Sequence, residues 1–97
     1  MKYFVLRLER GGPWDWSRGM REQDGWDEHA AFMDGLVQEG VIVLGGPLED
    51  ERYTMHIVAT GSEEELRERF AADPWWVNGM LQPIAIERWE ILLDARG

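Results

Sequence analysis

Six segments with regular apolar spacing follow one another along this sequence, and their order constrains the fold more than any single motif does. The four strand-like segments are 2–9, 41–46, 52–60 and 82–93, and the two helical ones are 25–39 and the run after Ser62. The order strand, helix, strand, strand, helix, strand is that of the ferredoxin-like βαββαβ arrangement. We therefore predict an α+β fold in which the helices cover one face of a four-stranded antiparallel sheet.

Capping residues mark the ends of the two predicted helices. Asp24 is a candidate N-cap for the first helix, and Gly40 suits the left-handed conformation that follows a last helical turn. Ser62 and Glu65 form an S-x-x-E capping box at the start of the second helix. We expect Pro74 to end that helix, because the residue before a proline avoids the helical region.

The two faces of the predicted sheet differ in character. The segment 41–46 is apolar throughout and predicts a central strand, whereas the early proline of 82–93 indicates a strand start or an edge. In segment 2–9 one face is apolar, formed by Phe4, Leu6 and Leu8. We expect the opposite face of the sheet to mix apolar and charged residues, among them Val5, Arg7, Glu9, Ile84, Ile86 and Glu90. Since monomers seldom leave a large apolar patch in water, this face predicts a homodimer packed sheet to sheet.

Length, charge and cysteine content limit the function classes. The 97 residues predict a single domain spanning 1–97, and a net charge of −9 weighs against nucleic acid and anionic membrane as partners. The absence of cysteine excludes disulfides, thiolate nucleophiles and zinc–thiolate sites, and it fits a reducing cytoplasm. The opening "MKYFVLRLER" lacks the features of a signal peptide, and no apolar run approaches a membrane span. We expect a soluble, cytoplasmic protein.

The segment 10–23 is rich in glycine and charge and lacks apolar periodicity, which predicts a loop. It nevertheless carries Trp14 and Trp16, and Trp26 follows near the start of the first helix. Such apolar bulk is unusual in a solvated loop. The three tryptophans are therefore candidates for the wall or lid of a ligand pocket, with burial in a dimer interface as an equal alternative.

The stretch "AADPWW" contains the start of a further, short helix after the second one. Asp73 followed by Pro74 is a common N-cap and first-turn pair, and Gly79 can close the short helix. Adjacent residues on a helix diverge by about 100°. We therefore expect one of Trp75 and Trp76 to fill the core and the other to face a cleft or a partner subunit.

Several motifs, in this order, resemble the YCII-related family of the dimeric α-β barrel superfamily. They are "YFVLRLE", the histidine and the GGP of "DEHAAFMDGLVQEGVIVLGGPL", then "ADPWWVNGM", and finally "IERWEI". The resemblance covers essentially the whole chain. It implies a ferredoxin-like subunit whose sheet packs against that of a second copy, and a cleft with a catalytic histidine and aspartate. Known chemistry in the family resembles dehydrochlorination of a chlorinated, hydroxylated aromatic, while wider relatives isomerise lactones, oxygenate polycyclic phenols or bind haem.

The resemblance places the catalytic pair on His29 and Asp73. A histidine near its ordinary pKa can take and return protons at neutral pH, and a carboxylate can orient it. The competing interpretation is a half-buried His29 bonded to a backbone carbonyl and an Asp73 that only caps a helix.

The resemblance also places the family's Gly-Gly-Pro turn on Gly45, Gly46 and Pro47. One departure concerns charge. Family members often carry an arginine three residues before the histidine, where this chain has Trp26. An anionic substrate would then need another cation, for which the sequence offers Arg18, Arg21 and Arg52.

The leading hypothesis is a small cofactor-free enzyme, a lyase or isomerase, in which His29 moves a proton on a compact aromatic or cyclic substrate and Asp73 orients it. The expected substrate-binding residues are Trp14, Trp16, Trp26, Gly46, Pro47 and Trp75. The alternatives are a non-catalytic dimer that binds a small molecule, and a structural dimerisation module. His56 is the other histidine, but no metal-ligand spacing includes it and no phosphate-binding glycine motif is present, so we expect neither metal nor nucleotide cofactor.

Overall fold

The computed structural model describes residues 1–97 and has the predicted order of elements, with one short addition, η1. The elements are β1 (Lys2–Arg10), η1 (Met20–Glu22), α1 (Trp26–Gln38), β2 (Ile42–Pro47), β3 (Tyr53–Thr60), α2 (Glu63–Phe70), α3 (Pro74–Val77) and β4 (Leu81–Trp89). The 3-10 turn η1 interrupts the segment predicted as a loop, and α3 is the short helix that begins at Pro74. No helix of the structure combines the length and the apolar character needed to cross a membrane.

The four strands form one antiparallel sheet in the order β2-β3-β1-β4. The prediction that segment 41–46 is a central strand is therefore wrong, because β2 pairs with β3 alone and lies at an edge. The start of the apolar run packs into the core, and its end does not. Val41 and Ile42 are buried in the core, whereas Leu44 is 63% exposed. The edge position expected for the strand with Pro83 is confirmed, and that strand ends at Trp89 rather than at residue 93.

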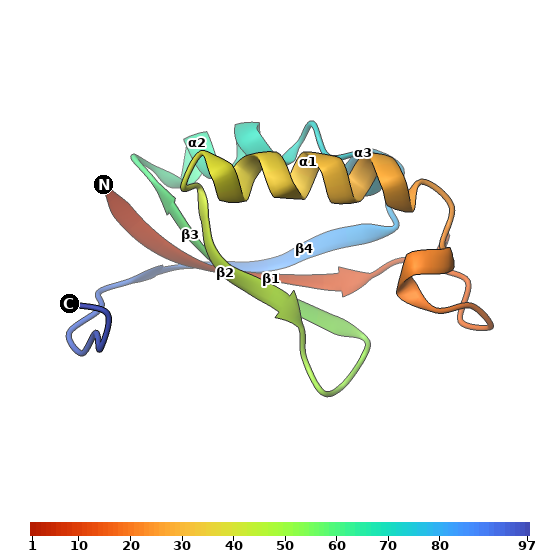
Figure 1. The fold of residues 1–97 in the computed structure, drawn as a ribbon, viewed down its shortest axis with the longest axis horizontal. Coiled ribbons are helices and arrows are strands. Elements are labelled where there is room, and N and C mark those ends of the chain that lie inside the picture. Colours follow the sequence, from red (N-terminus) through yellow and green to blue (C-terminus); the bar gives the residue numbers. More distant parts are fainter.

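The helices lie together on one face of the sheet (Figure 1), as predicted for an α+β ferredoxin-like fold. The apolar row of β1, formed by Phe4, Leu6 and Leu8, is buried beneath them. Leu66 and Phe70 of α2 complete this core, and neither is exposed to solvent. Burial of each such side chain stabilises the fold by about 1.5–3 kcal/mol.

The open face of the sheet differs from the prediction on β4. The pairing of β1 with β4 shifts register between Arg7 and Leu8, so that β4 has one extra residue there. Beyond this bulge Ile86 pairs with Leu6 and packs against the helix-side core. The expectation that Ile86 lies on the open face is therefore wrong, since one inserted residue exchanges the two faces. Glu90, expected on the same face, lies beyond the end of β4. The β4 residues paired with open-face positions of β1 are Ala85, Glu87 and Trp89.

Of the four predicted helix ends, two are confirmed and one is wrong, while α2 already ends at Phe70 and Pro74 begins α3. Gly40 has a φ of +78°, and the Ser62 hydroxyl accepts a hydrogen bond from the Glu65 amide at 3.1 Å. Asp24 is not the N-cap of α1. That position belongs to Gly25, with a φ of +79°, where a side chain would be strained and would press on a tryptophan ring.

Candidate functional site

His29 and Asp73 lie 44 residues apart in sequence and meet in the interior of the protein. His29 is in the first turn of α1, and Asp73 is the N-cap of α3. The His29 Nδ1 atom is 2.8 Å from Asp73 Oδ1 and 3.0 Å from Oδ2. Both residues are buried, with 7% and 2% of their surface exposed. The geometry expected for an oriented imidazole is therefore present.

Asp73 also caps a helix, which was the alternative interpretation of this residue from the sequence. Its Oδ1 accepts the backbone N–H of Trp75 at 3.1 Å and so caps α3. One carboxylate thus starts a helix and binds an imidazole at the same time. Because Nδ1 faces this carboxylate, Nε2 is the nitrogen of His29 that remains available to a ligand.

Trp75 forms a flat support for the imidazole. Its ring stacks on His29 with a centroid separation of 4.0 Å and an interplanar angle of 10°. The indole N–H donates to the Asp24 carbonyl oxygen at 2.9 Å, and Trp14 packs edge-on against the ring at 5.3 Å. Trp76 instead lies 5.8 Å from Phe70 and packs against the main core. The two adjacent tryptophans therefore separate as predicted, one to the site and one to the core.

A cavity of about 470 Å³ lies beside His29, between α1 and the edge strand β2. Its volume is in the range that small-molecule sites occupy. Most of the lining is apolar. Of the residues expected to bind substrate, the cavity is lined by Trp14, Trp26, Gly46, Pro47 and Trp75.

Trp16 is placed elsewhere. It is 58% exposed and lines a neighbouring cavity of about 400 Å³. It contacts Trp14 at a ring separation of 6.3 Å, so that Trp14 stands between it and the His29 site. We expected both Trp14 and Trp16 to line the same pocket, and this expectation is wrong for Trp16.

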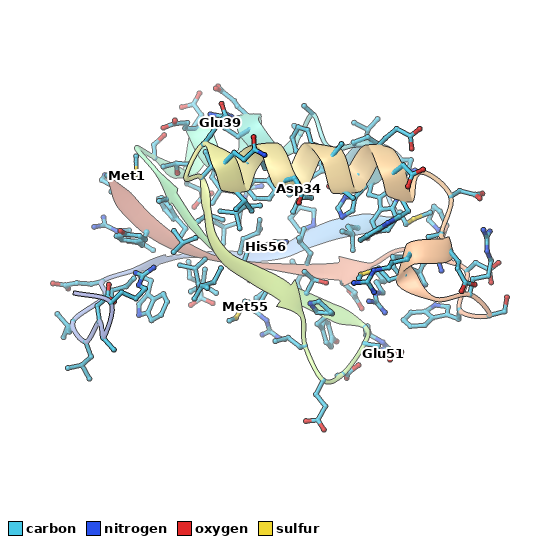
Figure 2. All side chains as sticks on the ribbon, in the orientation of Figure 1. Met1, Asp34, Glu39, Glu51, Met55 and His56 are labelled. Atoms are coloured by element: carbon cyan, nitrogen blue, oxygen red, sulfur yellow. The ribbon has the colours of Figure 1, made fainter.

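His56 is a second histidine on the wall of the cavity, and sequence reasoning gave it no role. Figure 2 shows His56 between α1 and the sheet, with Met55 on the opposite side. The residue is buried, and neither ring nitrogen has a hydrogen-bond partner. Burial lowers the pKa of His56 to about 4, with His29 acting in the same direction and Asp73 opposing it. His56 is therefore neutral at physiological pH.

Gly45 explains how the imidazole of His56 fits. Gly45 lies opposite His56 in the β2–β3 ladder, and a Cβ at this position would overlap the ring. Gly46 has open space around it. Both glycines belong to strand β2, so the expectation of a Gly-Gly-Pro turn is wrong. Position 45 needs a glycine because the ring of His56 comes so close to the backbone there. The pattern of residues along one strand does not reveal such a requirement.

None of the three arginines proposed for an anionic substrate lines the cavity with His29. Arg18 forms a salt bridge with Asp24 at 3.3 Å, and Arg21 lies over the ring of Trp26. The arginine that does line the cavity is Arg10 at the end of β1. The sequence does indicate that Arg10 faces the helices, because it continues the two-residue alternation of the buried row of β1.

No group of three or more histidine, cysteine, aspartate or glutamate side chains comes together in a way that could hold a metal ion.

Comparison with known proteins agrees with this fold. No curated protein matches the chain. One similar solved structure is the 5-chloro-2-hydroxyhydroquinone dehydrochlorinase of Burkholderia phenoliruptrix, in complex with 2,5-dihydroxybenzoquinone. It is 23% identical, with a TM-score of 0.65, over 90% of this chain and 93% of the other. The model of the YCII-related domain matches residues 1–90. The chain therefore belongs to the YCII-related domain family.

Proposed function

We propose that this protein is a small enzyme that needs no cofactor and transfers a proton on a compact aromatic or cyclic substrate, as a lyase or isomerase. The observation that carries the proposal is the buried contact between His29 Nδ1 and the Asp73 carboxylate, on the wall of an apolar cavity. His29 accepts a proton through Nε2 and later returns it. Asp73 holds the ring in one orientation and stabilises the imidazolium that forms.

The lining of the cavity supports a flat, ring-shaped substrate. Trp14, Trp26 and Trp75 belong to the lining of the cavity and make its wall largely aromatic, which suits a planar ring. The structurally similar dehydrochlorinase was solved with 2,5-dihydroxybenzoquinone, which is a planar six-membered ring. In an elimination of this kind the base takes a proton while chloride leaves with its bonding electrons. His29 is the residue placed to take that proton.

We also propose that the protein works as a homodimer joined through the open faces of its sheets. Leu44 and Trp89 are large apolar residues of this sheet that remain 63% and 42% exposed. A stable interface buries about 1,600 Å² in total. Light scattering should therefore give twice the 11.3 kDa mass of one chain at micromolar concentration. A stable monomer would refute the dimer and leave the proton-transfer proposal intact.

The function is tested by chloride release from 5-chloro-2-hydroxyhydroquinone and by turnover of chlorinated catechols and small lactones. Once one compound turns over, His29→Gln and Asp73→Asn should each reduce kcat by about 10²–10⁴-fold. The double variant should lose little more, because the two residues act as a unit. Asn caps a helix about as well as Asp, so Asp73→Asn separates rate from folding.

Asp34→Asn is the matched control, because Asp34 also lines the cavity but forms no hydrogen bond or salt bridge with His29. It should leave kcat within a few-fold of wild type. The rival function is a non-catalytic protein that binds a small molecule in the same cavity. Saturable binding of 2,5-dihydroxybenzoquinone without turnover of any compound in the panel would favour that rival.

A further inference from the structure

Arg10 occupies an unusual place for a cation. It is the last residue of β1 and continues the row of Phe4, Leu6 and Leu8, which faces the helices. The other three members of this row are buried in the core, whereas Arg10 lines the cavity beside His29. It also lines the neighbouring cavity, so its side chain lies at the boundary between the two.

This guanidinium forms no salt bridge, although the chain has 19 acidic residues and only 10 lysines and arginines. Arg10 takes part in none of the five salt bridges of the protein, and its Nε is buried without an acceptor. Burial lowers the pKa of Arg10, and the charge of Glu51 on the β2–β3 connection opposes this effect. A partly buried cation with no paired acid costs free energy, and a bound anion would recover it.

Aromatic contacts hold the guanidinium in place. It lies over the ring of Trp14 at 4.1 Å and over that of Trp16 at 5.8 Å. Trp14 in turn packs against Trp75, which stacks on His29. The cation is therefore linked to the imidazole through aromatic contacts, and its planar fork is positioned before any ligand arrives.

We propose that Arg10 binds an anionic oxygen of the ligand, and that the cavity therefore selects flat ring compounds that carry a carboxylate. The ring lies among the tryptophans, with the carboxylate on Arg10 and the reacting part at His29. This inference rests on the proposed function for the cavity as the ligand site. Beyond that function, the inference specifies a negative charge on the ligand and names Arg10 as the residue that binds it. Asp34, the acid of the cavity lining, is exposed, and Glu49 and Glu51 line only the neighbouring cavity; none of the three forms a salt bridge with Arg10.

The test compares two probes that differ in charge and not in shape, 4-hydroxybenzoate and 4-hydroxybenzamide, by isothermal titration calorimetry. Wild type should bind the carboxylate at least about tenfold more tightly than the amide, because a hydrogen bond to a charged group exceeds a neutral one by roughly this factor. Arg10→Gln should abolish this preference and leave the affinity for the amide within about threefold of wild type. Higher ionic strength should weaken the carboxylate complex alone.

Two further variants separate recognition from packing. Arg10→Lys keeps the charge without the planar fork, so it should retain part of the preference for the carboxylate. Arg18→Gln removes a cation of the neighbouring cavity and should retain all of it. Equal binding of both probes by wild type would overturn the inference and leave an aromatic site in place. Failure of both probes to bind would overturn the inference, whereas the proposed function is judged separately by the turnover panel described above. An equal loss in Arg10→Lys and Arg10→Gln, with lowered melting temperatures, would assign Arg10 to packing on Trp14 and refute its role in recognition.

Discussion

Replacement of His56 by Phe should remove a large part of the acid sensitivity of the fold. In the folded protein burial holds the pKa of His56 at about 4, whereas an unfolded chain has the ordinary value of about 6.5. Between these two values the unfolded chain binds a proton that the folded chain does not. Stability therefore decreases as pH falls from about 6.5 to about 4. The Phe side chain preserves a buried ring and removes the titration.

The size of the effect follows from this pKa difference. A difference of about 2.5 units corresponds to about 3 kcal/mol at about 1.36 kcal/mol per unit. Over this range of pH the free energy of unfolding of the wild type should therefore fall by about 3 kcal/mol more than that of the variant. The comparison uses the change with pH and not the absolute stability, so a packing defect in the variant does not obscure it.

The assay is urea unfolding followed by circular dichroism at half-unit steps of pH from 7.5 to 4, on wild type, His56→Phe and His56→Asn. Both variants should show a shallower dependence on pH than wild type. Parallel curves for the three proteins would refute the reasoning, because they would mean that His56 binds its proton equally well in the folded and unfolded chains.

Three smaller predictions concern packing and caps, each measured by urea unfolding. Gly45→Ala should destabilise the protein by about 1–3 kcal/mol, because the new Cβ overlaps an imidazole, while Gly46→Ala should change stability by less than about 0.5 kcal/mol; similar values would contradict the overlap. Trp14→Ala should cost about 3–5 kcal/mol, whereas the exposed Trp16→Ala should cost less than about 1 kcal/mol; the reverse order would refute this packing. Ser62→Ala should cost about 0.5–2 kcal/mol, and an unchanged stability would mean that its hydroxyl does not cap α2.

The sequence predicts the fold well because the fold depends on periodic patterns. The alternation in β1 and the cap at Ser62 each follow from local rules, and both are confirmed. The position of β2 at an edge does not follow from such rules, since an apolar run fits a central strand equally well. The register of β4 depends on a bulge, and no local pattern announces a single inserted residue.

The site is predicted only in part. The family resemblance brought His29 and Asp73 together, and the structure places their side chains in contact. His56 was missed because alternation along β3 allows its ring to face either side of the sheet. Arg10 was missed because it follows the predicted strand 2–9 and so was grouped with the loop, although the alternation continues through it. Contacts across strands, such as the one that Gly45 permits, become visible only when the pairing is known.

The stacking of Trp75 on His29 gives the protein an optical reporter. An excited indole can pass an electron to a protonated imidazole in contact with it, but much less readily to a neutral one. With the rings 4.0 Å apart and nearly parallel, the emission of Trp75 should dim when His29 holds a second proton and recover when the proton leaves. In a variant in which Trp75 is the single remaining tryptophan, stopped-flow fluorescence would follow the proton on His29 in real time, without a label.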